Sequence, residues 1–154
     1  MSARAYFSMK LPSKPVSHLV KGKLRLSLNA DNPDGGILFE ALSGARGWQY
    51  RGSWVQKGKG CLPPRKDYSI STQRLWLPHV KGVEGSFYAI SPFMVNAGNG
   101  VMRGDFGVHF DANVPGSAGC IVLPRQDHWD IWRKHVEDLR KDGLQSIPLE
   151  VVYE

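Results

Sequence analysis

The apolar residues of this chain come in short runs that glycine and proline repeatedly interrupt. Its 154 residues include 17 glycines and 10 prolines. In 23–29 the apolar residues alternate strictly with polar ones, which is typical of a strand with one buried face. Apolar segments broken up in this way favour strands and turns over long helices, so we predict a mostly β domain.

Further short apolar runs are bounded by Gly, Pro, Asn or Asp and are predicted as strands. They are 37–42, 48–54, 68–72, 86–90, 106–110, 119–123 and 147–153. One helix is predicted near 127–142, because apolar residues recur there at offsets of three and four. Asp127 is placed to cap its start and Gly143 to end it. The expected fold is a β-rich α+β domain with one packed helix.

The length of the chain is that of a single domain. Residues 1–22 contain Pro12 and Pro15 and show no clear periodicity, so they predict an irregular N-terminal arm ahead of one domain at 23–154. No apolar stretch approaches the ~20 residues of a membrane helix, and 1–20 lacks the apolar run of a signal peptide. We therefore expect a soluble chain without an export signal.

The net charge of +6 is concentrated in the first half of the chain, which suits a polyanionic partner. Within it, 46–59 interleaves four Lys or Arg residues with Trp48, Tyr50 and Trp54. This mixture is compatible with glycan-strand contact, or with solvated charges on a strand whose aromatic residues face inward. Nucleic acid is an unlikely partner, because no recognised binding motif is present.

The segment 103–123 carries the residues best suited to chemistry. Phe106, Val108 and Phe110 would lie on one face of a strand, which leaves His109 on the other. The loop 112–118 then allows the chain to reverse and bring Cys120 beside His109. An imidazole next to a thiol lowers the thiol pKa and accepts its proton.

Gly119 adds a further feature of an acyl-transfer site. A glycine before the cysteine lets the backbone approach a substrate closely, so the N–H groups of Gly119 and Cys120 are candidates for an oxyanion hole. The alternative is that Cys120 is a small buried hydrophobe and His109 a structural polar residue.

The arrangement of His109 followed by Ser117-Ala118-Gly119-Cys120-Ile121 resembles the signature of the L,D-transpeptidase (YkuD-like) catalytic domain. That signature is a strand histidine, a loop and then Ser/Thr-His-Gly-Cys. The segment 62–70 is similar to the family's upstream Thr-Pro-x-Gly-x-Phe/Tyr-x-Ile motif. Ala118 replaces the motif histidine and Val122 replaces a frequent arginine, so the chain resembles divergent members such as secreted antibacterial effectors.

The resemblance implies a YkuD-like β-sandwich or mixed sheet and a cysteine acyl-transfer reaction on peptidoglycan stem peptides. Cys120 would attack the L,D peptide bond, and His109 would be the base. The Phe110 carbonyl would orient the imidazole, with Asp111 as the alternative. Transfer to an amine and hydrolysis by water both remain open.

Several nearby residues are candidates for substrate binding. They are Arg103, Asp111, Asn113, Ser117 and Ala118. Arg103 would bind a stem-peptide carboxylate in place of the missing family arginine. Ser117 and Asn113 are equally compatible with turn formation alone.

No cofactor is expected. The spacing of His109, Asp111, Cys120 and His128 matches no common zinc pattern, so no metal site is predicted. Cys61 has no assigned role. The resemblance implies activity at the cell wall, in the periplasm or outside the cell. Because no signal peptide is expected, we expect the protein to be encoded by a phage or delivered as an effector. An inactive wall-binding or virion structural module is the alternative function.

Overall fold

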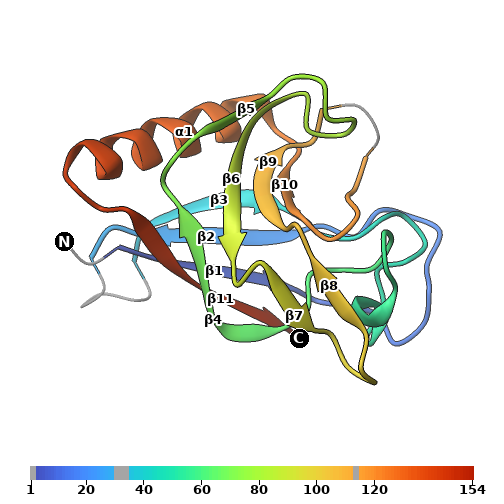
Figure 1. Ribbon diagram of the computed structural model, residues 1–154. Coiled ribbons are helices and arrows are strands. Elements are labelled where there is room, and N and C mark those ends of the chain that lie inside the picture. Colours follow the sequence, from blue (N-terminus) through green and yellow to red (C-terminus); the bar gives the residue numbers. More distant parts are fainter. Residues whose placement is uncertain (1–2, 30–34, 113–114) are drawn as a thin grey trace.

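The computed structural model describes residues 3–29, 35–112 and 115–154, and its elements are shown in Figure 1. The strands are β1 (Arg4–Met9), β2 (Gly22–Ser27), β3 (Ile37–Ala41), β4 (Arg65–Ser71), β5 (Leu75–Leu77), β6 (Gly85–Ser91), β7 (Met94–Asn96), β8 (Met102–Gly104), β9 (Gly107–Phe110), β10 (Ile121–Leu123) and β11 (Ser146–Tyr153). A 3-10 helix, η1 (Ser53–Val55), and one α-helix, α1 (Gln126–Lys141), complete the described elements. The predicted β-rich α+β class is confirmed.

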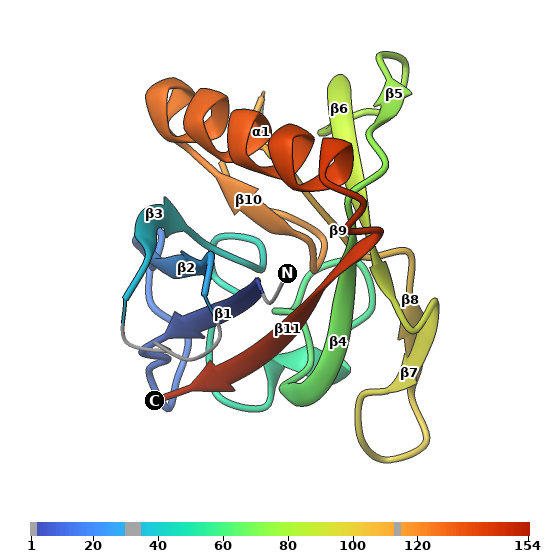
Figure 2. The same ribbon diagram turned by 90° about the vertical axis from the view of Figure 1, so that its left-hand side faces the viewer.

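The main sheet has the order β10-β9-β6-β4-β11-β1-β2-β3, and β5 pairs with β6 beyond this path. β1 runs parallel to β11 and β10 parallel to β9, whereas the other pairs are antiparallel. The two ends of the sheet meet where Leu42 and Val122 exchange backbone hydrogen bonds of 2.9 Å. The sheet therefore curls into a nearly closed barrel (Figure 2).

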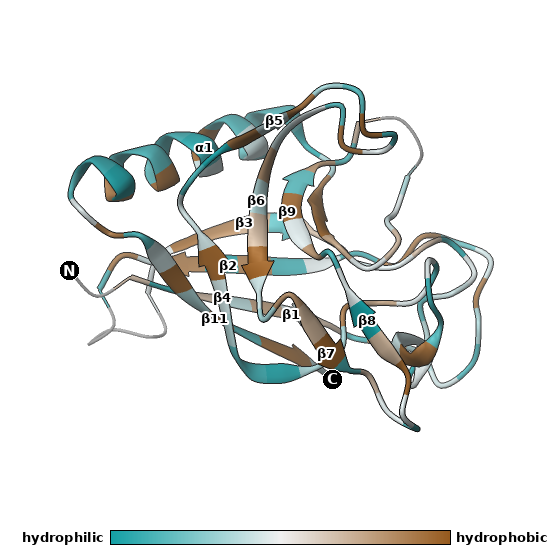
Figure 3. Ribbon diagram, in the orientation of Figure 1, coloured by the Kyte–Doolittle hydropathy of each residue, from teal (hydrophilic) through white to brown (hydrophobic). Residues whose placement is uncertain are grey.

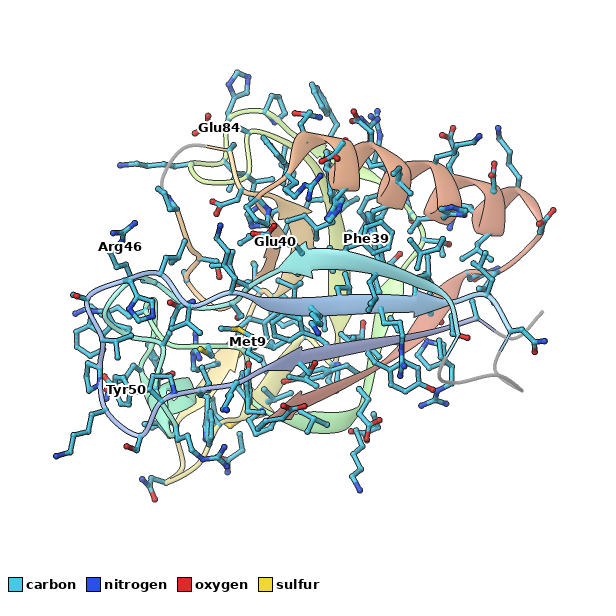
Figure 4. All side chains as sticks on the ribbon, turned by 180° about the vertical axis from the view of Figure 1, so that it is seen from behind. Met9, Phe39, Glu40, Arg46, Tyr50 and Glu84 are labelled. Atoms are coloured by element: carbon cyan, nitrogen blue, oxygen red, sulfur yellow. The ribbon has the colours of Figure 1, made fainter. Side chains whose placement is uncertain are left out.

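Helix α1 covers one side of this curled sheet (Figures 1 and 2). Its buried residues are the four at offsets of three and four: Trp129, Trp132, Val136 and Leu139. The Trp132 ring meets the Phe39 ring edge to face at 5.7 Å, and Figure 4 shows Phe39 below the helix. Apart from the exposed Ile131, the rest of the helix surface is mostly hydrophilic, while brown apolar segments mark the strands (Figure 3). The predicted helix and its buried face are confirmed.

The two helix ends differ in how well the sequence predicted them. The prediction that Asp127 caps the start is wrong, because α1 begins at Gln126 and the N-cap is Arg125, without a side-chain cap bond. The Asp127 carboxylate instead pairs with Arg125, 2.6 Å from Nη2. Gly143 lies just after the helix with φ 97°, the left-handed conformation that glycine adopts readily. The predicted C-terminal stop is therefore confirmed.

The prediction of an irregular arm at 1–22 is wrong for its first part. β1 lies inside the sheet between β11 and β2, and buries Ala5, Phe7 and Met9 on alternate positions. A short strand in the middle of the sheet can form here because both neighbours complete its backbone hydrogen bonds. Among the described residues, no helix is long and apolar enough to cross a membrane.

The strand predicted at 48–54 is also wrong. This part of the chain forms turns and η1, with Gly47 and Gly52 at φ 83° and 89°. Such positive φ values interrupt an extended strand. Trp54 stacks on Tyr153 of β11 at 5.6 Å, so tertiary packing determines the course of the segment.

Candidate active site

His109 lies on β9, in the part of the sheet between β6 and β10. The predicted faces are confirmed: Phe106 and Val108 are buried in the core, and His109 lies on the other side, stacked on Phe87 with centroids 5.9 Å apart. The His109 Nδ1 atom is 2.8 Å from the carbonyl oxygen of Phe110. This contact assigns the ring proton to Nδ1 and leaves Nε2 as the acceptor.

Cys120 stands directly before β10 and reaches the same region. β10 pairs parallel to β9 with Val122 opposite His109, so Cys120 comes next to Gly107. Cys120 and His109 line one cleft of about 460 Å³. The thiol lies 3.9 Å from the carbonyl of Asp105. The sheet register thus brings the two predicted residues to one cleft. The hydrogen bonds of their side chains are made with backbone carbonyls, those of Phe110 and Asp105.

Burial controls the charge state of both groups. It raises the pKa of the Cys120 thiol to about 11, against smaller lowering effects of the Gly107 N–H and the Arg103 charge. Burial also lowers the pKa of His109 below its ordinary value of 6.5, against a smaller raising effect of the Phe110 carbonyl. At pH 7 the resting pair is therefore a neutral thiol and a neutral imidazole, the forms that general-base catalysis requires.

The segment 115–120, called the cysteine loop below, leads into β10. The hydroxyl of Ser117 connects this loop to the rest of the protein. Its Oγ donates to the Cys120 carbonyl at 2.6 Å and accepts N–H groups from Gly44 at 3.1 Å and Gly119 at 3.2 Å. Ser117 therefore braces the loop, and because it also lines the cleft, its predicted role in substrate binding stays a prediction. The prediction of Gly119 as an oxyanion donor needs correction, because its N–H is already bound by Ser117.

Gly119 has a second, steric role. Its φ is 127°, and an added Cβ would lie 2.5 Å from Arg103 Nη2 and 2.7 Å from the Phe106 ring. Only glycine lets the backbone pass this close to Arg103. The residue therefore fixes the approach of the loop to the core rather than supplying a free donor.

We expect Ser117→Ala to lower the free energy of unfolding by about 1–2 kcal/mol, because two N–H groups and one carbonyl lose their partner. Urea denaturation followed by fluorescence measures this change. The control is Ser71→Ala, which removes one acceptor for the Gln73 N–H at an exposed site. Equal losses in the two variants would contradict the bracing role.

Arg103 lines a smaller cavity of about 290 Å³ together with Cys120 and Ala118, but its guanidinium is bound to the backbone. Its side chain is only 4% exposed, and its guanidinium donates to four backbone carbonyls, those of Trp54, Gly60, Cys61 and Ala118. Through these bonds, Arg103 links the segment that contains η1 to the cysteine loop. Four of its five N–H donors are thus bound to the backbone, so we assign Arg103 to loop support, and its predicted binding of a substrate carboxylate stays a prediction.

The other predicted binding residues lie in different surroundings. The Asp111 carboxylate accepts the Gly116 N–H at 3.1 Å, which makes it a turn residue outside the cleft lining. Ala118 lines the cleft, and its predicted contact with substrate stays a prediction. Asn113 lies outside the described residues. Asp111 thus shapes the loop, and the Phe110 carbonyl holds the imidazole.

Cys61 is a buried free thiol that forms no disulfide with Cys120. Its sulfur lies 3.3 Å from the Ser43 carbonyl, and burial raises its pKa to about 11. The Cys61 carbonyl accepts from Arg103, which also bonds to Ala118. Cys61 therefore supports the cysteine loop indirectly through the backbone.

Sequence reasoning missed the wall of the cleft. It is mostly apolar and comes from β5, the loop after it, β6 and the turn that follows β6: Leu75, Leu77, Val80, Val83, Phe87 and Phe93. Lys81 is the one cation among the residues that line the cleft. In the sequence, the apolar segment 75–77 could have indicated this wall. In the structure, its Leu75 and Trp76 remain 38% and 61% exposed.

The residues considered for zinc do not assemble. His128 Nδ1 accepts the Glu40 N–H at 2.9 Å, on β3 beneath α1. Among the residues that the structure describes, no three His, Cys, Asp or Glu side chains come together as a metal site.

The segment 46–59 carries one small aromatic surface. Lys59 Nζ lies 4.4 Å from the Trp48 ring centroid, and the Trp48 and Tyr50 rings are 6.4 Å apart. Figure 4 shows Arg46 and Tyr50 on the loops that follow β3, at the edge of the molecule. Trp54 instead packs inward.

In comparisons with known proteins, no family model, no curated protein and no solved structure matches this chain.

Proposed function

We propose that the protein is a cysteine acyl-transfer enzyme that acts on peptidoglycan stem peptides, as an L,D-transpeptidase or L,D-carboxypeptidase. The observation that supports it most is that Cys120 and His109 line one cleft while the Phe110 carbonyl holds the imidazole Nδ1. A thiol, a base and an orienting acceptor are the parts of a nucleophilic triad.

In the proposed reaction, His109 Nε2 takes the thiol proton as the Cys120 sulfur attacks the carbonyl carbon of the L,D peptide bond. The C–S bond forms, the C–N bond breaks, and the imidazolium returns the proton to the departing D-amino acid. Water or an amine then attacks the thioester, and the thiol is regenerated. Water gives a carboxypeptidase product, and an amine gives exchange or a cross-link.

The surroundings of the pair suggest how the substrate is held. The Cys120 N–H remains the proposed oxyanion donor, since Gly119 is bonded to Ser117. Lys81 takes the carboxylate-binding role first expected of Arg103, because it is the cation in the cleft lining. Trp48, Tyr50 and Lys59 form the proposed contact with a glycan strand. Such a substrate places the site of action at the cell wall.

The test is incubation with a purified disaccharide tetrapeptide, with and without an added D-amino acid, followed by mass spectrometry. The proposal predicts loss of the terminal D-residue, or its replacement by the added one. Binding to peptidoglycan without any change in the peptide would support the inactive wall-binding module instead.

The pH dependence of kcat/KM should show a single acidic limb with a midpoint below 6.5. Below the lowered pKa of His109, the imidazole is protonated and cannot accept the thiol proton. The value of kcat/KM therefore rises as the pH increases through that pKa. Because the thiol pKa is near 11, no second limb is expected between pH 7 and 9. A midpoint above 7 would contradict a buried His109 base.

A further inference from the structure

A second cleft lies away from Cys120. It has a volume of about 590 Å³ and is lined by Thr72, Gln73, Arg74, Tyr88, Arg133, Glu137, Arg140 and Lys141. In Figure 1 the chain between β4 and β5 runs beside the last turns of α1, and these two segments supply most of the residues that line the cleft. Phe87 lines the Cys120 cleft and its neighbour Tyr88 this one, so the two clefts lie on opposite faces of β6.

The charges in this basic cleft are unbalanced. Three arginines and one lysine face a single carboxylate, that of Glu137. Among the described residues, no carboxylate lies within 4.0 Å of any of these cations, whereas ion pairs do form elsewhere on the surface. Like charges that line one cleft favour binding of an anion that neutralises them.

The cations are partly fixed in place before any ligand arrives. Arg140 Nη1 donates to Thr72 Oγ1 at 3.2 Å, and Arg74 Nη1 donates to Ser86 Oγ at 3.2 Å. The Thr72 hydroxyl is itself held, since it donates to the Leu144 carbonyl at 2.7 Å. Positioned guanidinium groups lose less side-chain entropy when they bind a ligand.

Arg133 lines the cleft beside Tyr88. Burial raises the pKa of the Tyr88 hydroxyl, and the nearby Arg133 guanidinium opposes this rise. The proximity of this hydroxyl helps to position Arg133 before a ligand binds.

We propose that this basic cleft binds a phosphate-bearing anion. Guanidinium groups match phosphate oxygens in pairs, and a dianionic phosphate offsets the excess positive charge better than a single carboxylate. The volume suits one or two phosphoryl groups with a small substituent. The site is independent of the reaction at Cys120, so it holds whether or not the protein acts on the cell wall.

The test is calorimetric titration of the full chain with inorganic pyrophosphate at low and at physiological salt. We expect saturable binding with one site per chain. Arg133→Gln and Arg140→Gln should each weaken it by about tenfold, as expected for loss of a charge-assisted contact. Arg51→Ala is the matched control, since it removes an exposed arginine outside the cleft, and it should leave the dissociation constant unchanged.

A parallel titration with a nucleoside diphosphate identifies the source of the phosphate. If pyrophosphate and the nucleoside diphosphate bind with equal affinity, the cleft recognises the phosphoryl groups alone. If the nucleoside diphosphate binds more tightly, the cleft recognises a nucleotide. Circular dichroism and thermal melting check that each variant is folded, and Arg133→Lys supplies a second variant that keeps the charge. Absence of saturable pyrophosphate binding, or equal affinities for the wild-type protein and the folded Arg133 and Arg140 variants, would overturn the proposal.

Discussion

Cys120→Ala is expected to abolish turnover of the disaccharide tetrapeptide, by at least about 10³-fold in kcat, because no other group can form the thioester. The cavity left by one sulfur at a partly exposed position should change stability little. Product formation followed by mass spectrometry measures the effect, and thermal melting shows whether the fold is kept.

Cys61→Ala is the matched control for this variant. Cys61 is also a free thiol with its pKa raised to about 11, but it is fully buried and does not line the cleft. We expect the folded Cys61→Ala protein to retain its activity. Loss of activity in Cys61→Ala with retention in Cys120→Ala would reverse the assignment of the nucleophile.

Arg103→Ala is expected to produce the largest loss of stability, about 3 kcal/mol or more in the free energy of unfolding. The reason is that four carbonyl groups lose a charged donor together, around a side chain that is 4% exposed. Urea denaturation measures the loss. Arg51→Ala, which removes an exposed arginine, should change stability by less than about 0.5 kcal/mol.

Arg103→Lys separates charge from geometry. Lysine keeps the positive charge but cannot reproduce the planar set of donors, so most of the destabilisation should remain. In any folded Arg103 variant, kcat should fall more than KM rises, since Arg103 positions the Cys120 loop and does not bind substrate. A variant with wild-type stability and only a raised KM would show instead that Arg103 binds substrate.

The strands that could be predicted are those in which alternation is visible over several residues. β2 and β11 alternate clearly and were predicted nearly in full, as was the apolar stripe of α1. β1 also alternates, but it was assigned to an arm because the prolines at 12 and 15 dominated the interpretation of the N-terminal segment. β5, β7 and β8 are three residues long, too short for any periodicity to show.

The candidate site was predictable where local geometry determines it. Strand alternation placed His109 away from the core, and the loop length allowed Cys120 to return beside it. The burial of Arg103 was not predictable, because its carbonyl partners at 54, 60 and 61 are more than 40 residues away in sequence. The same limit applies to the apolar cleft wall, which depends on how β5 pairs with β6.

The central claim is that the Cys120 sulfur carries the acyl group, and rapid acid quenching followed by intact-protein mass spectrometry tests it most directly. With the disaccharide tetrapeptide, the wild-type protein should gain the mass of the substrate acyl group, and fragmentation should place it on Cys120. The adduct should be absent in Cys120→Ala and present in Cys61→Ala. Turnover of the tetrapeptide by the Cys120→Ala protein, or an adduct on any other residue, would contradict the account.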